Sequence, residues 1–344
     1  MPEIATTRRN AVDLPERMRS VGVAEYFGRM LDDRPPLRIG TRSSPLAMAQ
    51  ARQVQALVRA TLPDLPTEIV PITTAGDKWR GDLSVLGGKG AFMKELDRAL
   101  ALGEVDLCVH CMKDVPGDVP RPDGFTWSAY LPREDPRDCL LVPTTSKARS
   151  LADLPPGARV GTSAVRRRAQ LGQHYPHLRT EYFRGNINSR IARLDEGEFD
   201  AAVLAYAGLQ RAELAHRAVE LLPLDMMCPA VGASVLGLEC RASDHGVDEL
   251  LKELDDAETR VHITAERTML GVLRGHCNSP IAGHATTTPD GQISLFGKVF
   301  TRDGSDWVYA QEWDKPERAA ELGSYVGATL LRKGGRDLID GIPH

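Results

Sequence analysis

The feature that most constrains this chain is an alternation of short apolar runs with stretches of helical periodicity, from residue 37 to about residue 212. It begins with "LRIGT" (37–41), which suits a buried strand, and continues through a loop in which Ser44 is placed to cap a helix. Val54 and Val58 then recur at helical spacing. Strands that alternate with helices of this length predict α/β domains built on doubly wound, parallel sheets.

The last part of the chain has a different pattern. A helix is predicted over "RVHITAERTMLGVL" (260–273), and two strands, "QISLFGKVF" (292–300) and "DWVYAQEW" (306–313), flank the turn "TRDGS". A further helix follows in "ERAAELGSYVGATLLRKGG". We therefore expect a small α+β domain at the C-terminus.

Composition excludes several classes of protein. The formal net charge of -4 gives no overall basic field for nucleic acid or anionic lipid, and aromatic residues make up only 5% of the chain. No apolar run approaches the roughly 20 residues of a membrane span, and the first residues lack the apolar segment of a secretory signal. Six cysteines in 344 residues are too few for a disulfide framework. These observations predict a cytoplasmic protein that binds neither nucleic acid nor membrane.

Basic and hydroxyl side chains collect where the predicted strands end, which is where open parallel sheets bind ligands. They are Arg42, Ser44, Lys113, Ser163, Arg166, Arg167, Arg184, Arg190 and Arg211. Guanidinium groups near helix N-termini suit carboxylates or phosphates. The set therefore predicts a cleft for a multiply anionic small molecule, although Arg166, Arg168 and Arg193 could each instead belong to a solvated helix face.

The stretch "CVHCMKDVPGDVP" (108–120) offers two kinds of chemistry. Cys108 and Cys111 lie on a predicted strand whose alternation points them to opposite faces, so a metal or redox site is disfavoured. Lys113 and Asp114 follow at the end of the strand. A carboxylate beside a cation keeps its charge and can stabilise positive charge that develops in a substrate, so this pair is the predicted chemical centre.

From about residue 37 to its end the chain resembles the hydroxymethylbilane synthase (porphobilinogen deaminase) family. The resemblance rests on collinear segments: "LRIGTRSSPLA", "GGKGAFMKELDRAL", "VHCMKDVP", "REDPRD", "GTSAVRRRAQL", "RGNINSRIARLDEGEFDAAVLAYAGLQR", "PAVGASVLGLECR" and "AERTML…GHCNSPIAG". It implies two periplasmic-binding-protein-like α/β domains beside a cleft, plus the small α+β domain. The expected limits are an arm over 1–36, domain 1 over 37–130 and 234–252, domain 2 over 134–228, and domain 3 over 257–344.

The resemblance also implies a function. The family joins porphobilinogen units head to tail with release of ammonia, on a dipyrromethane primer held as a thioether by a cysteine that matches Cys277. Asp114 matches the catalytic carboxylate, with Lys113 beside it. The expected cofactor-binding residues are Cys277, Arg42, Ser44, Lys89, Lys113, Arg166, Arg167, Arg184 and Arg190; the expected substrate-binding residues are Arg42, Phe92, Arg184, Arg190 and Arg211. We expect no metal, no macromolecular partner and a monomer.

The chain departs from the family's usual residues at several matched positions. Val85 stands for Lys, Cys111 and Ala164 each stand for Ser, and Ala233 and Ser234 interrupt the usual "PAVGQG"; His276, Asn278 and Ser279 are unusual neighbours for Cys277. Three interpretations follow: a divergent but working synthase, a specialised paralogue that makes a shorter or different oligopyrrole, or a non-catalytic binder of anionic pyrroles. Retention of Asp114 and Cys277 disfavours the binder.

Overall fold

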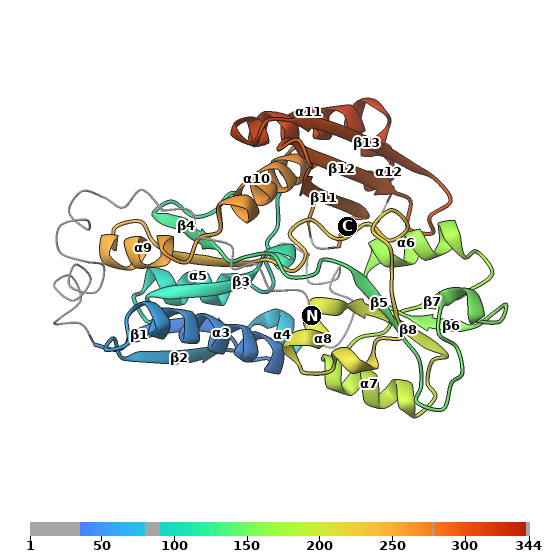
Figure 1. The fold of residues 1–344 in the computed structure, drawn as a ribbon, viewed down its shortest axis with the longest axis horizontal. Helices are drawn as coiled ribbons and strands as arrows, with labels where there is room; N and C mark the ends of the chain where they lie inside the picture. The colour runs from blue at the N-terminus through green and yellow to red at the C-terminus, as the bar shows by residue number, and fades with distance from the viewer. Residues whose placement is uncertain (1–34, 80–89, 277, 342–344) are drawn as a thin grey trace, which may run out of the picture.

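The computed structural model describes residues 35–79, 90–276 and 278–341. In these ranges the strands form two sheets of five strands and one sheet of three. Figure 1 shows the two larger sheets side by side, with the smaller sheet above them. None of the helices described has both the length and the apolar character that a bilayer span requires.

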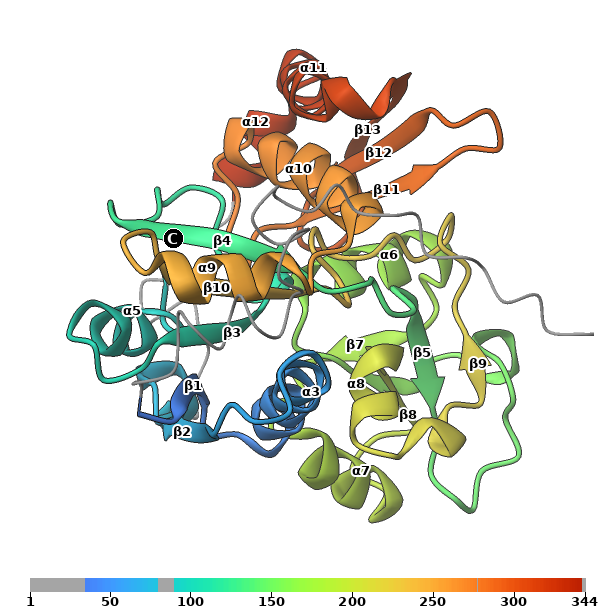
Figure 2. The ribbon, with the colours of Figure 1, turned by 60° about the vertical axis from the view of Figure 1, so that its left-hand side comes forward.

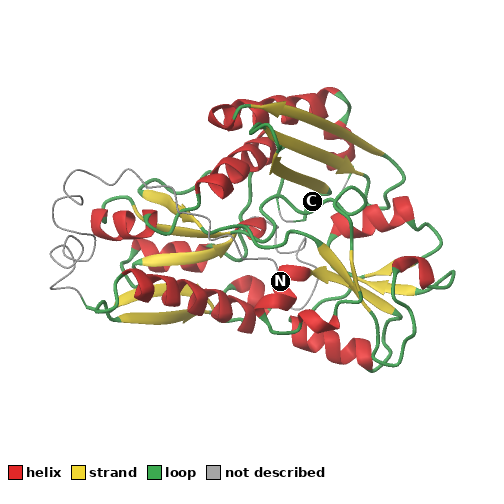
Figure 3. Ribbon diagram, viewed as in Figure 1, coloured by secondary structure: helices red, strands yellow, loops and turns green. Residues whose placement is uncertain are grey.

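The first large sheet has the strand order β2-β1-β3-β10-β4. Its strands are β1 (Leu37–Arg42), β2 (Thr67–Ile72), β3 (Leu107–Cys111), β4 (Phe125–Tyr130) and β10 (Leu236–Arg241). Helices α3 (Pro45–Thr61) and α9 (His245–Lys252) share an apolar core with Leu107 and Val109 of β3, whereas α5 (Lys94–Ala101) packs with Cys108. Alternate residues of β3 therefore face helices on opposite sides of the sheet. Figure 3 shows helices packed around the strands of both larger sheets.

The second large sheet has the order β7-β6-β8-β5-β9. Its strands are β5 (Asp138–Leu141), β6 (Arg159–Gly161), β7 (Arg179–Glu181), β8 (Ala201–Ala205) and β9 (Glu220–Leu221); its helices are α6 (Val165–His174), α7 (Ile187–Asp195) and α8 (Tyr206–Arg211). Leu140 packs with Leu171 of α6, and its neighbours Cys139 and Leu141 pack with α7 and α8. This sheet is also covered on both faces.

The α/β fold class is confirmed, but the expectation of purely parallel sheets is wrong. In the first sheet β10 is antiparallel to β3 and β4, and in the second β5 is antiparallel to β8 and β9. Both reversed strands lie next to a segment that crosses between the sheets: β5 follows residues 131–137, and β10 follows residues 222–235. The sequence analysis missed both strands, because they enter a sheet from the other domain rather than from a preceding strand–helix pair.

The third sheet is an antiparallel meander of β11 (Ile281–Thr287), β12 (Ile293–Phe300) and β13 (Trp307–Asp314). Helices α10 (Ala257–Val272) and α11 (Ala319–Arg332) share its apolar core, and α12 (Gly335–Asp340) follows α11. The predicted hairpin and both long helices are confirmed, and β11 is an addition. The limits proposed for the three domains stay predictions. The proposed arm also stays a prediction, because its residues 1–34 lie outside the described ranges.

Candidate active site

A cleft lies where β1, β3 and β8 end, and it is lined by both α/β domains. Figure 2 shows the two walls meeting where α3 lies beside α8. The first domain contributes Arg42, Ser44, Phe92, Cys111, Lys113 and Asp114, and the second contributes Ala205, Gly208 and Arg211. The structure thus brings six of the predicted site residues to one cleft, as the strand-end rule requires.

Arg42 lies at the centre of the first wall, between two carboxylates. Its Nη2 is 2.5 Å from Oδ1 of Asp77, and its Nη1 is 3.5 Å from Oδ2 of Asp114. The guanidinium also lies 3.9 Å from the centre of the Phe92 ring. Burial alone would lower the pKa of Arg42, but the hydrogen bond to Asp77 and the charge of Asp114 outweigh it and raise that pKa. Arg42 is therefore a fixed cation beside the predicted catalytic carboxylate.

Local structure explains how Asp114 reaches the cleft. Strand β3 ends at Cys111, and a single 3-10 turn over Met112–Asp114 follows it. The buried side chain of Met112 anchors this turn, while the Asp114 side chain keeps 31% of its surface exposed. Of the two cysteines on this strand, Cys108 is fully buried, whereas Cys111 is partly exposed and lines the cleft.

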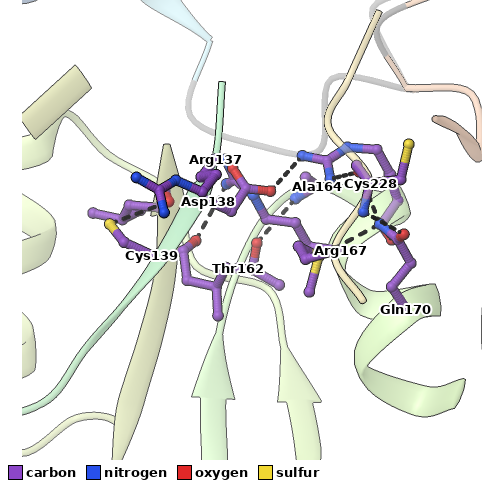
Figure 4. A network of polar contacts seen from close by, with 12 residues as sticks. Arg137, Asp138, Cys139, Thr162, Ala164, Arg167, Gln170 and Cys228 are labelled. Atoms are coloured by element: carbon purple, nitrogen blue, oxygen red, sulfur yellow. Dashed lines mark hydrogen bonds and ion pairs between the residues drawn. The ribbon is translucent and has the colours of Figure 1, made fainter. Parts of the chain in front are cut away.

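Arg166 and Arg167 project from the first turn of α6 onto one buried carboxylate. Asp138, the first residue of β5, lies 2.7 Å from Nη2 of Arg166 and 2.8 Å from Nη2 of Arg167. Figure 4 shows Asp138 and Arg167 pointing toward one another from strand and helix. Burial would raise the pKa of Asp138, but the two arginines outweigh it and hold that pKa well below its usual range. Arg166 is only 6% exposed, so it does not belong to a solvated helix face.

Backbone carbonyls take further hydrogen bonds from the same arginines. Nη1 of Arg166 donates to the carbonyl of Cys228 at 2.5 Å, and Nη1 of Arg167 donates to that of Val203 at 3.2 Å. Gln170 on the next turn of α6 also holds Cys228, through its main-chain N–H and carbonyl. Both guanidinium groups are therefore fixed before any ligand binds.

Arg190 lies among other cations. Burial, followed by the charges of Arg167 and Arg184, lowers the pKa of Arg190 to about 10. Among the described residues, its Nε is a buried donor with no hydrogen-bond acceptor. Arg184 reaches the other wall, where its Nη2 donates to the carbonyl of Gly76 at 3.3 Å. A buried donor among like charges is the environment that an anionic ligand would stabilise.

Arg211 lines the cleft but is already paired. Its Nε lies 3.1 Å from Oε2 of Glu134, and its Nη2 donates to the carbonyl of Ser234. Both partners belong to the segments that cross between the domains. Arg211 therefore connects the cleft wall to the crossing point, and its predicted role toward substrate stays a prediction.

Comparisons with known proteins agree with this geometry. A family model described as "Porphobilinogen deaminase, dipyromethane cofactor binding domain" matches residues 37–249, and the corresponding C-terminal domain model matches residues 261–332. The chain belongs to the porphobilinogen deaminase family. It is 49% identical to "Porphobilinogen deaminase 2" of Streptomyces coelicolor over 90% of this chain and 97% of that one. It is 44% identical to "Porphobilinogen deaminase" of Syntrophotalea carbinolica over 87% and 93% of the two chains.

A comparison of folds adds a solved structure, the VFT2 domain of Bordetella pertussis BvgS. It is 16% identical, covers 67% of this chain and 90% of that one, and aligns with a TM-score of 0.41.

The residues around the cleft fit the anionic cofactor that a porphobilinogen deaminase carries. Of the seven predicted basic side chains that are described, Arg42, Lys113 and Arg211 line the cleft. Arg166, Arg167, Arg184 and Arg190 are not among its lining residues, although Arg184 donates to Gly76 and acts, with Arg167, on the charge of Arg190. Four carboxylates, Asp77, Asp114, Asp138 and Glu134, contact four of the seven. Positive charge is in excess, and the buried Nε of Arg190 lacks an acceptor within the described ranges. Those ranges contain no cluster of three or more His, Cys, Asp or Glu side chains arranged to hold a metal ion.

Some predicted residues of this deaminase site lie outside the described residues. They are Lys89 and Cys277, together with the departure at Val85. Other departures are described. Ala164 stands at the N-cap of α6, where its N–H donates to Oγ1 of Thr162 at 3.4 Å, and Ser234 has a left-handed φ of 64°.

The sequence analysis missed three carboxylates that hold site arginines: Asp77, Glu134 and Asp138. Asp77 follows the strand β2, and the other two lie in "REDPRD", a segment used only to establish the family resemblance. Only Asp77 follows the carboxyl end of its strand and could have been selected by the criterion that selected the basic residues. Glu134 precedes β5 and Asp138 begins it, and the sequence analysis did not predict this strand, so these two residues had no such signal.

Proposed function

We propose that this chain joins porphobilinogen units head to tail and releases ammonia at each step, on a dipyrromethane primer attached to Cys277. The observation that carries the proposal is the cleft itself. Asp114 lies beside Arg42 and Lys113 in the cleft, and Arg211 of the second domain lines the same cleft. A partly exposed carboxylate beside several cations suits a reaction that develops positive charge on a substrate with several carboxylates.

Asp114 has the central role in this mechanism. Loss of the amine from porphobilinogen leaves a cationic, azafulvene-like carbon, and the new carbon–carbon bond then releases a proton from the pyrrole that attacks it. The Asp114 carboxylate assists departure of the amine and stabilises the cation by charge. Its side chain keeps 31% of its surface exposed beside Arg42, so it is accessible to the substrate.

The basic residues of the site bind and orient the carboxylate groups of the cofactor and the substrate. We assign the acetate and propionate groups of cofactor and substrate to the basic residues Arg42, Lys113, Arg166, Arg167, Arg184, Arg190 and Arg211. Ser44 and Lys89 complete the proposed cofactor site, and Phe92 is proposed to contact the substrate through its ring. The dipyrromethane, when bound, supplies the pyrrole carbon to which the first unit is added. Preorganised guanidinium groups lower the cost of ordering such a ligand.

The measurement that tests this function is the intact mass of the denatured protein, before and after incubation with porphobilinogen. We expect a starting mass above that of the sequence by one dipyrromethane, increasing in pyrrole-sized steps. The Cys277→Ala variant should lack the added mass, and Asp114→Asn should keep its fold but stop the increase.

Other outcomes identify the alternatives. Growth that stops before four added units would indicate a paralogue that makes a shorter product, which the departures at Cys111 and Ala164 favour. A bare mass that never changes, in folded protein, would contradict the synthase and favour a binder.

We also propose a cytoplasmic monomer, because closure of two domains around a growing chain needs no second subunit; sedimentation tests the oligomeric state.

A further inference from the structure

The helix α4 (Ala75–Lys78) holds a carboxylate rigidly beside the cleft. Asp77 accepts hydrogen bonds from Oγ1 of Thr74 at 2.7 Å and from the main-chain N–H of Thr74 at 3.3 Å, and its own N–H donates to Oγ1 of Thr74. This capping box fixes both the start of the helix and the direction of the Asp77 side chain.

Arg42 is shared unequally between Asp77 and Asp114. Asp77 takes two hydrogen bonds, from Nη2 at 2.5 Å and from Nε at 3.3 Å, whereas Asp114 takes one contact from Nη1 at 3.5 Å. The Phe92 ring supports the guanidinium plane, and Gly76 lets that ring lie close to α4, since a Cβ at Gly76 would overlap it. The Nε and Nη2 groups of Arg42, which can form a two-hydrogen-bond pair with one carboxylate, therefore face Asp77 and not Asp114.

The two carboxylates compete for one cation. A guanidinium forms its strongest pair when two parallel N–H groups meet one carboxylate. If Asp77 did not hold Arg42, Asp114 would be the acidic neighbour left for that pair, because the charges of both carboxylates already act on Arg42. A fully paired Asp114 would keep its charge, but the guanidinium would offset its field and occupy oxygens that a cationic substrate needs.

We propose that Asp77 is a positioning residue that keeps Arg42 from closing an ion pair with Asp114. The inference rests on the proposed function, in which Asp114 must act on the substrate. It also gives α4 a second role: the carbonyl of Gly76 accepts the hydrogen bond of Arg184 from the second domain, so the helix that restrains Arg42 also joins the two walls of the cleft.

Steady-state kinetics of Asp77→Asn tests the proposal. We expect kcat to fall by about 10-fold or more, with a smaller change in KM, since the loss falls on the charged step rather than on binding. The matched control is Glu95→Gln. Glu95 also supports α4, through the N–H of Ala75 at 3.0 Å, and the variant removes the same charge without touching Arg42. It should keep wild-type kcat and KM.

A double-mutant cycle separates positioning from loss of structure. The coupling between Arg42 and Asp114, measured from the thermal stabilities of Arg42→Gln, Asp114→Asn and the double variant, should be weak in the native background. It should strengthen in the Asp77→Asn background, where the pair can close. A merely structural role for Asp77 would leave this coupling unchanged.

The outcomes distinguish the inference from the function. Wild-type kcat in Asp77→Asn, or an unchanged coupling, would overturn the positioning role while leaving an active synthase. Absence of turnover in the wild-type chain would contradict the proposed function, and the coupling would still test the arrangement because it needs no activity.

Discussion

One residue of the segment 222–235, which crosses between the sheets, has a strained backbone next to the cleft. Ser234 has a φ of 64°, in the left-handed region that favours glycine, and its Oγ donates to the carbonyl of Asp135 in the other crossing segment at 2.8 Å. Its own carbonyl accepts from Arg211. The serine therefore combines an unfavourable backbone conformation with a hydrogen bond that a glycine could not make.

Two substitutions at Ser234 separate these effects. Ser234→Ala keeps the strain and loses the hydrogen bond, so we expect it to lower the free energy of unfolding by about 1 kcal/mol. Ser234→Gly loses the same bond but relieves strain of about 1 kcal/mol, so its stability should be close to wild type. Urea unfolding at constant m-value measures both. Equal loss in the two variants would show that the left-handed backbone carries no strain here.

At the scale of elements, the β12–β13 turn of the third domain packs directly on α6, the helix that presents Arg166 and Arg167. Gly304 has a φ of 79°, and a Cβ there would overlap the carbonyl oxygen of Ala169; a Cβ at Gly172 would likewise overlap that of Asp303. Lys298 adds a 2.6 Å hydrogen bond to Gln173. The third domain thus contacts α6 along the face that carries Arg166, since Ala169 and Gln173 follow Arg166 by three and seven positions.

Gly304→Ala should disrupt this contact. We expect a loss of stability of about 2 kcal/mol or more, because the new methyl group adds steric overlap to the strain of a left-handed alanine. Gly291→Ala is the control: its φ is 83°, and no atom lies within 4 Å of its Cβ position, so it has the strain alone. The contact between turn and helix would be unimportant if both variants unfolded at the same urea concentration.

In the whole molecule, the third domain meets both crossing segments at one buried carboxylate. Glu266 of α10 accepts from the N–H groups of Gly232, in a crossing segment, and Ala285, in β11, each at 2.8 Å. Its Oε1 also lies 2.8 Å from Nη2 of Arg133, in the other crossing segment. Burial would raise the pKa of Glu266, but Arg133 and the hydrogen bonds outweigh it and lower that pKa to about 2.

This junction predicts how the protein responds to acid. Since the pKa of Glu266 is lower in the folded state than in the unfolded state, the unfolded state binds more protons as the pH falls, and stability is lost between about pH 5 and pH 2. Glu266 should contribute about 3 kcal/mol to this loss. Urea midpoints measured from pH 6 to pH 2 test it.

The control variants for this pH series are Glu266→Gln and Glu258→Gln. Glu266→Gln should be less stable at neutral pH, because it leaves Arg133 buried without a partner charge, yet it should lose less of its remaining stability in acid. Glu258 is exposed on the same helix, so its replacement by Gln should keep the wild-type pH dependence. A wild-type slope in Glu266→Gln would show that other carboxylates control acid unfolding.

Local sequence was sufficient for several elements and for six residues that line the cleft. Apolar periodicity placed α3 and α10, Ser44 caps α3 as expected, and polar residues after β1 and β3 reached the cleft. These features depend on neighbours within one or two turns of chain, which is why a single sequence carries them.

Long-range pairing decided the rest. The reversed strands β5 and β10 each join a sheet after a crossing between domains, and the carboxylates that hold the arginines become visible only as contacts. Asp138 meets arginines 28 and 29 positions away, and Asp77 meets Arg42 across 35. Local propensity does not encode which carboxylate pairs with which arginine. The pairing depends on how deeply the two groups are buried and how far apart they lie, and only the folded chain brings them together.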